Sequence, residues 1–181
     1  MIKRSQERQL RARAASILER MGFPLGPQEL AGIAVADFGL GDPEREGAQI
    51  LTLFATDRIS AKLIVLFPGQ ILPEHWHPPV GSDPGKEEIL RGYWGDVLYF
   101  EEGSDNVDDS EFPSSKPECY TCRSRIDLKP GAQVVIPPGR KHWMKGGEGG
   151  GCVISFSTCV RDILDQFSDS AIIRTTQIVE D

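Results

Sequence analysis

Histidine is scarce in this chain, with only three among its 181 residues. The sequence also has no apolar run close to the roughly 20 residues that a membrane-spanning helix needs, and its first residues lack the apolar core of a signal peptide. We therefore expect a cytoplasmic protein that has no membrane partner. Positive charge is not in excess either, since the net charge is −7, which argues against a nucleic-acid partner.

Cysteine is present but sparse. Cys119 and Cys122 form a C-x-x-C pair, whereas Cys152 and Cys159 lie well downstream. A zinc ribbon requires a second close pair, and a thioredoxin-like motif requires a helix that begins after a strand, but the sequence around Cys119 predicts extended chain. Reduced structural thiols are the favoured interpretation, and a metal or redox role stays open.

What the sequence does contain is a helical beginning followed by many short strands. Apolar residues at helical spacing predict an amphipathic helix over residues 4–21. From about Gln49 onward, runs of Val, Ile, Leu and Phe alternate with Gly, Pro and Asp, which is typical of an antiparallel sandwich or barrel. We predict a single domain, 1–181, with an N-terminal helical arm (1–48), a β-barrel (49–160) and a C-terminal tail (161–181).

Two stretches interrupt the predicted strands. Residues Glu101–Lys116 are acidic and show no period, which predicts a solvated surface loop. The run GGEGGG, Gly146–Gly151, predicts a flexible turn between the strands KHWMK and CVISFST; it is not a phosphate loop, because no Lys-Ser/Thr and helix follow it. After Thr158, the sequence VRDILDQF predicts a short helix.

The histidines carry the most chemical information. His75 and His77 are separated only by Trp76. Because side chains alternate along a strand, the two imidazoles project to one face and Trp76 to the other. That arrangement suits a divalent ion, although two histidines at this spacing are, on their own, more often ordinary polar residues.

Further residues raise the case for a metal site. Glu88 lies in a strand expected to pair nearby, and alternation places Lys86 on the same face as Glu88. His142, the last histidine, follows a Pro-Pro-Gly turn. All three histidines therefore lie in positions where they could converge on one ion.

At this level of detail the sequence resembles the cupin superfamily. The residues that match its two motifs, G-x5-H-x-H-x-E-x6-G and G-x5-P-x-G-x2-H, are Gly69, His75, His77, Glu88, Gly95, Gly131, Pro137, Gly139 and His142. There are two departures: the gap between His77 and Glu88 is longer than usual, and Gly146 stands where an Asn often ends the second motif.

The long gap is itself similar to one branch of the cupins, the bacterial D-lyxose isomerase family. The segments EHWHPPVGSDPGKEE, IPPGRKHW, ERQLRARAASILERMGFPL and DFGLGD carry this resemblance, so it spans most of the chain. It implies an all-β fold, the cupin double-stranded β-helix (a jelly-roll barrel) with an N-terminal α-helix. It also implies a homodimer and a monosaccharide substrate.

The cupin motifs imply a metal held by His75, His77, Glu88 and His142. The six residues between Glu88 and Gly95 select Glu88 over its neighbour Glu87, which is then expected to face away. This donor set suits Mn, Fe, Co, Ni or Zn without choosing among them, and the family resemblance implies Mn(II).

A ketol isomerase moves a proton between adjacent sugar carbons through a cis-enediol. A metal ion polarises the carbonyl and stabilises the developing negative charge, while a base carries the proton. We expect Glu88 to act as ligand and base, Lys86 to be catalytic and to contact substrate oxygens, and Arg140 to be a second substrate-binding candidate, although a surface turn is an equally good place for Arg140. The family often has an acidic residue where this chain has Ser155 in VISFST, and that difference would impair or redirect catalysis.

Two other functions fit the same ligands. A cupin dioxygenase would use them to hold Fe(II) and leave positions open for substrate and oxygen. A non-catalytic sugar-binding protein would keep the metal site and lack the base. The fold alone does not separate these possibilities.

Overall fold

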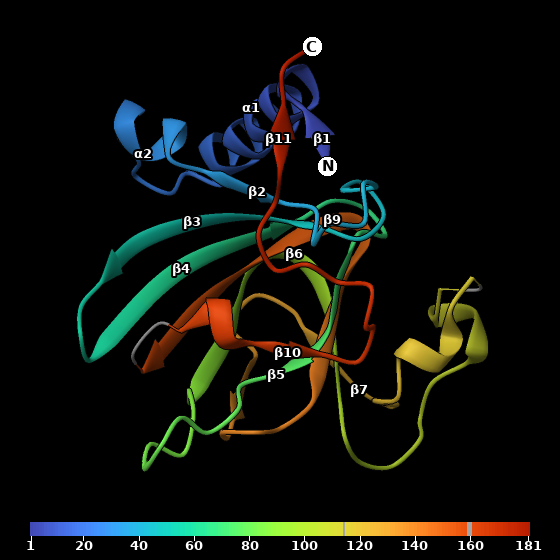
Figure 1. The fold of residues 1–181 in the computed structure, drawn as a ribbon. Coiled ribbons are helices and arrows are strands. Elements are labelled where there is room, and N and C mark those ends of the chain that lie inside the picture. The colour runs from blue at the N-terminus through green and yellow to red at the C-terminus, as the bar shows by residue number, and fades with distance from the viewer. Residues whose placement is uncertain (114, 159–160) are drawn as a thin grey trace.

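A computed structural model describes residues 1–113, 115–158 and 161–181. Within these residues, nine strands form one antiparallel sheet that curls into a barrel, with helix α1 on its outside (Figure 1). The helices are α1 (Arg4–Arg20) and α2 (Pro27–Ala31), with single-turn 3-10 helices at Asp109–Glu111, Pro117–Cys119 and Asp162–Leu164. The strands are β1 (Ile2–Lys3), β2 (Ala34–Ala36), β3 (Ala48–Ala55), β4 (Ile59–Leu66), β5 (Ile71–Trp76), β6 (Glu88–Glu101), β7 (Ser124–Leu128), β8 (Gln133–Ile136), β9 (His142–Thr158), β10 (Gln166–Phe167) and β11 (Ile178–Val179).

Strand β9 organises the sheet, because it has partners along both edges. On one side it pairs with β6 over most of its length, from Glu101↔His142 to Glu88↔Ser157. On the other side its beginning pairs with β5 and its end pairs with β4. The remaining strands extend the sheet outward, with β3 and β2 beyond β4 and with β7 and β8 beside β6. The segment 1–48 thus contributes β2 to the sheet as well as helices.

The predicted turn at Gly146–Gly151 is wrong, because these residues lie inside β9. Their glycines allow neighbouring backbones to come close: a Cβ on Gly146 would lie 2.1 Å from the carbonyl oxygen of Phe67, and one on Gly151 would lie 2.6 Å from that of Asp96. Gly150 also has a φ of 73°, a left-handed conformation that favours glycine. The glycines therefore let one strand bend and change partners, where the sequence suggested two strands and a loop.

Side chains that point into the barrel change character along each strand. Leu66 and Ile64 of β4, Leu90 of β6, and Met144 and Val153 of β9 belong to one buried apolar cluster. Toward one end of the barrel the next inward positions are polar, and they are Lys62, Glu88, His142 and Ser155. The barrel is thus a packed core that carries a polar cavity at its end.

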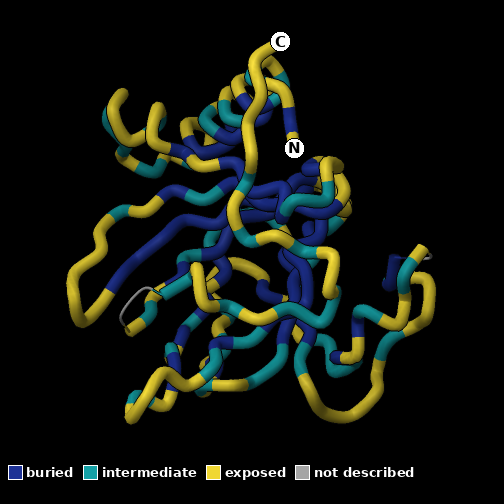
Figure 2. Tube along the Cα trace, in the orientation of Figure 1, coloured by how far each residue is buried: buried dark blue, intermediate teal, exposed yellow. Residues whose placement is uncertain are grey.

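Two further apolar clusters cover the outside of the sheet. Figure 2 shows that buried residues are concentrated along the sheet strands and also occur in helix α1. The apolar face of α1, including Leu10, Ala14 and Leu18, packs on residues of β3 and β4 such as Leu63. The predicted surface loop Glu101–Lys116 is less solvated than expected, because it buries Phe112 over Trp143. No helix in the described part of the chain is long and apolar enough to cross a membrane.

The C-terminal segment 161–181 pairs with two parts of the molecule, the barrel and the N-terminal strand beside α1 (Figure 1). Strand β10 pairs antiparallel with β5, with Phe167 opposite His75 and Gln166 opposite Trp76. Strand β11 pairs parallel with β1 beside helix α1. The predicted short helix in VRDILDQF is a single 3-10 turn, Asp162–Leu164, and Val160 and Cys159 lie outside the described residues.

The glycine run in β9 gives a direct test of this fold. We expect Gly146→Ala to lower the free energy of unfolding by about 1–3 kcal/mol, because the added methyl group has no room against the Phe67 carbonyl. Gly149→Ala is the matched control, since a Cβ there would meet nothing within 4 Å. Urea unfolding of both variants measures the difference, and equal stabilities would contradict the close approach.

Candidate active site

The three histidines meet at the polar end of the barrel. One ring nitrogen from each of His75, His77 and His142 lies within 4.8 Å of the others, and all three side chains are buried. His75 lies one residue before the end of β5, His142 begins β9, and the two residues face each other directly across the ladder. Their ring centroids are 4.3 Å apart. Strand pairing therefore brings together residues that are far apart in the sequence.

Backbone carbonyls hold two of these imidazoles in a defined orientation. Nδ1 of His75 is 2.8 Å from the carbonyl oxygen of Pro73, and Nδ1 of His142 is 2.9 Å from that of Arg140. A carbonyl can only accept, so each Nδ1 carries the proton and each Nε2 keeps a free lone pair. This is the arrangement that metal-binding histidines usually have.

Glu88 completes a donor set suited to a divalent ion. Its Oε2 lies 2.9 Å from Nε2 of His77. Two donors in neighbouring positions of an octahedral metal, at bond lengths of about 2.1 Å, lie about 3 Å apart. Three imidazoles and one carboxylate are also the donors that suit Mn, Fe, Co, Ni or Zn. The residues present therefore fit a metal ion.

The protonation states favour metal binding as well. Burial lowers the pKa of all three histidines: that of His77 falls to about 3, and those of His75 and His142 also lie below the ordinary value. The nearby charge of Lys86 adds to the effect at His77. Neutral imidazoles are the form that binds metal, so no proton has to be displaced from a charged ring.

Ser155 stands where the family often has an acidic residue, and the structure shows what it contacts. Its hydroxyl donates a hydrogen bond to Oε1 of Glu88, from the strand next to it. Burial alone would raise the pKa of Glu88, but the charge of Lys86 and the Ser155 hydrogen bond bring it below the ordinary value. Lys86 and Ser155 thus help to keep Glu88 ionised, and the hydrogen bond from Ser155 also orients its carboxylate.

Lys86 lies beside Glu88, as the sequence predicted, although it precedes β6 and is not part of the strand on which that prediction relied. Its Nζ is 3.4 Å from Oε2 of Glu88 and 3.2 Å from Oδ1 of Asp162. Burial opposes its charge, yet Glu88, Asp162 and Asp165 together raise its pKa above the ordinary value, so Lys86 stays protonated. Glu87, its neighbour, is exposed, as expected.

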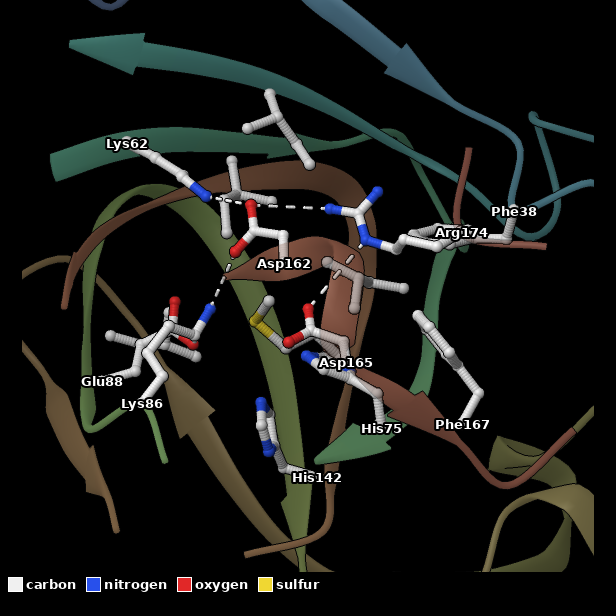
Figure 3. A pocket seen from close by; sticks show the side chains of 15 residues that line it. Phe38, Lys62, His75, Lys86, Glu88, His142, Asp162, Asp165, Phe167 and Arg174 are labelled. Atoms are coloured by element: carbon white, nitrogen blue, oxygen red, sulfur yellow. Dashed lines mark hydrogen bonds and ion pairs between the residues drawn. The ribbon is translucent and has the colours of Figure 1, made fainter. Parts of the chain in front are cut away.

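One cavity joins these groups, and Figure 3 shows its lining. Three cations and three carboxylates line it together with His75 and His142, and aromatic and aliphatic side chains form its other wall. The charged lining residues are Lys62, Lys86, Arg174, Glu88, Asp162 and Asp165. Small polar molecules with several hydroxyl groups suit such a lining, because it offers both donors and acceptors next to the metal ligands.

Sequence reasoning missed four of these charged residues. Lys62 could have been found, because it alternates with the inward-facing Ile64 and Leu66 on β4. Asp162, Asp165 and Arg174 come from the C-terminal segment, whose sequence gives no periodic signal. Asp162 contacts Lys62, Lys86 and Arg174, which hold its pKa below the ordinary value although burial would raise it. Burial raises the pKa of Asp165 to about 7.

Arg140 does not reach the cavity, so the geometry does not support the substrate-binding role predicted for it. Its guanidinium donates to the carbonyl oxygen of Glu102 at 3.1 Å, and its own carbonyl holds His142. The turn that places the carbonyl correctly directs the side chain outward. Among the described cysteines, Cys119, Cys122 and Cys152 are free thiols, and burial raises the pKa of each above its ordinary value, which agrees with a structural role.

Curated relatives of this chain are sugar isomerases. It is 44% identical over 168 residues to a D-lyxose ketol-isomerase of Cohnella laeviribosi, covering 92% of each chain. It is 40% identical to a D-lyxose/D-mannose isomerase of Thermosediminibacter oceani, covering 98% of this chain and 99% of that protein. The chain belongs to the D-lyxose ketol-isomerase family. No model in a scan of protein families matches the sequence.

Solved structures confirm the fold of this family member. The L-ribose isomerase of Cellulomonas parahominis, determined with no ligand, aligns with a TM-score of 0.81 over 98% of both chains, at 18% identity. That identity supports the fold alone. The all-β cupin barrel with an N-terminal helix, which the sequence predicted, is confirmed by this similarity and by the curled antiparallel sheet.

Ion pairs anchor the C-terminal segment beside the cavity. Nζ of Lys116 lies 2.8 Å from Glu46 and 2.6 Å from Asp169, and the Lys116 side chain is largely buried. Glu74, itself 1% exposed, accepts a hydrogen bond from Ser168 at 2.5 Å. The segment that supplies Asp162 and Asp165 is therefore fastened just after those residues.

We expect Lys116→Met to lower the free energy of unfolding by about 1–3 kcal/mol at neutral pH, because it leaves two buried carboxylates without their cation. Burial alone would raise the pKa of Asp169, but the hydrogen bond from Lys116 holds it below the ordinary value. This stabilisation is therefore present above the pKa of an unfolded Asp, about 3.9, and is lost as the pH falls through the lower folded value.

Urea unfolding of the parent and of Lys116→Met between neutral and acid pH measures this contribution. The difference in stability should shrink as the solution becomes acid. Arg4→Met is the control, since its ion pair with Glu180 is exposed and we expect a change below about 0.5 kcal/mol. A pH-independent difference would contradict the role of the ion pairs.

Proposed function

We propose that this protein is a divalent-metal-dependent isomerase that interconverts a free aldose and its ketose, with D-lyxose and D-xylulose as the reference pair. The observation that carries the proposal is the convergence of three neutral histidines and ionised Glu88 at the polar end of the barrel, beside the cavity, in a chain that belongs to this family. The name of a second relative supports D-mannose as a further substrate to test.

His75, His77, Glu88 and His142 would hold the metal ion. We favour Mn(II), on the family resemblance, and Zn, Fe, Co or Ni would suit the same donors. When bound, the ion would polarise the sugar carbonyl and stabilise negative charge on its oxygen. The apolar wall of the cavity would limit the access of water to the reacting carbons.

Glu88 is the residue that we assign to proton transfer. An aldose becomes a ketose when the proton on C2 moves to C1 and a hydroxyl proton moves from O2 to O1. The carboxylate of Glu88 would take the proton from C2 and return it to C1, so one group could serve both steps of the transfer between the two carbons. Its lowered pKa keeps it ionised, and the Ser155 hydrogen bond fixes its direction.

Lys86 would assist the same step by electrostatics. Its ammonium group stays charged and lies beside Glu88, so it can donate to substrate oxygens as negative charge develops on the enediol. Asp162 holds Lys86 in that position from the opposite side. In this view Ser155 supports the base, and catalysis does not depend on a second carboxylate at position 155.

A colorimetric ketose assay tests the proposed reaction. We expect the Mn-loaded protein to form ketose from D-lyxose, with D-mannose and other aldoses as a comparison panel. The reaction should proceed without oxygen and should exchange the C2 proton with solvent. Oxygen consumption with Fe(II) would point to a dioxygenase. Metal and sugar binding without product from any aldose would point to a binding protein, and either result would overturn the proposal.

The ligand set has its own test. We expect His142→Ala to lose stoichiometric metal after dialysis, because it removes one of the ligands. Arg140→Ala is a matched control two residues away: its side chain points outward, and the carbonyl that holds His142 remains. Metal content by elemental analysis measures both variants, and full metal in His142→Ala would mean that the site is misplaced.

Two further expectations belong to the proposal. A homodimer is supported by a shallow apolar groove on the outside of the sheet, where Phe54, Ile59 and Phe156 are exposed and a second subunit could cover them. A cytoplasmic location stays a prediction from the sequence.

A further inference from the structure

We propose that Asp165 is a positioning residue for the metal ligand His77: its carboxylate accepts the Nδ1–H of that ring and directs Nε2 toward the metal. This inference rests on the metal site of the proposed function, and it concerns metal affinity, not the identity of the sugar. It assigns a role in the centre to the C-terminal segment, which lies outside both cupin motifs.

His77 differs from the other two histidines in what holds it. His75 and His142 each use the carbonyl oxygen of the residue two positions earlier. Nδ1 of His77 is buried and has no hydrogen-bond partner among the residues that the structure describes. The group beside it is the carboxylate of Asp165, whose Oδ1 lies 3.3 Å away. A small rotation of either side chain would complete the hydrogen bond.

The pairing of β10 with β5 explains how Asp165 reaches this position. Phe167 lies opposite His75, and Gln166 lies opposite Trp76. Continuing the same antiparallel register by one residue brings Asp165 opposite His77. The contact is therefore fixed by the strand ladder, and Phe167 packs on His75 in the same arrangement, with ring centroids 5.7 Å apart.

Of the two carboxylates of this segment that line the cavity, Asp165 is the one free to accept a hydrogen bond from His77. Asp162 is committed to Lys62 and Lys86, with Arg174 at 3.6 Å. Oδ2 of Asp165 lies 4.0 Å from Nε of Arg174, which is too far for a hydrogen bond, and the Asp165 side chain is 8% exposed. A carboxylate on Nδ1 fixes the tautomer of a metal-binding histidine and makes Nε2 a stronger donor, and removing such a partner typically weakens metal affinity about 10–100-fold.

The test is the dissociation constant for Co(II) or Mn(II), measured by titration on the full chain. We expect Asp165→Ala to weaken binding about 10–100-fold. Asp165→Asn should lie between this variant and the parent, because an amide oxygen still accepts the hydrogen bond but carries no charge. Glu180→Gln is the matched control, since it removes one negative charge from the same C-terminal segment, at the exposed ion pair with Arg4 and away from the Lys116 anchor.

The possible results distinguish a direct effect on His77 from a failure of this proposal or of the proposed function. A Co(II) absorption spectrum that changes in Asp165→Ala, with a metal-free unfolding temperature equal to that of the parent, would support a direct effect on His77. Unchanged affinity in Asp165→Ala, or an equal loss in Glu180→Gln, would overturn the proposal. If the parent itself binds no metal, the proposed function fails instead.

Discussion

The pairing of β9 with its neighbours is the constraint on which the site depends. His142 at its beginning faces His75 of β5, and Ser155 near its end reaches Glu88 of β6. Because β9 pairs with β6 on one side and changes from β5 to β4 on the other, a single strand joins three of the strands that line the cavity. The glycines at Gly146–Gly151 make that change possible by letting backbones approach where side chains would collide.

The site also depends on a balance of positive and negative charges inside the barrel. Burying any one of the charged lining residues alone would be costly. They occur instead as interlocked pairs: Asp162 contacts Lys62, Lys86 and Arg174, while Lys86 also contacts Glu88 (Figure 3). The histidines are neutral, so the lining itself is close to neutral, and a bound divalent ion would make it positive. Such a cavity favours the developing negative charge of an enediol over a neutral sugar.

The C-terminal segment is part of the sheet and also contacts the charged residues of the site. It pairs with β5 at the metal ligands, supplies the partners of Lys86 and Lys62, and is fastened through Lys116 and Glu74. Its short strands would not be stable alone, so their position depends on these contacts with the barrel. The molecule thus adds a less regular segment to a regular sheet, and the two together line the cavity.

The sequence by itself determined the class of fold, the three histidines with Glu88, and the placement of Lys86, because period-2 alternation and motif spacing are local properties. It did not determine that Gly146–Gly151 continue a strand, since the reason lies in the backbone of Phe67 and Asp96 across the sheet. Tertiary structure alone decided that Arg140 points outward and that Asp162, Asp165 and Arg174 reach the cavity. Those residues lie in an aperiodic segment, and their positions follow from strand register and ion pairs with residues distant in the chain.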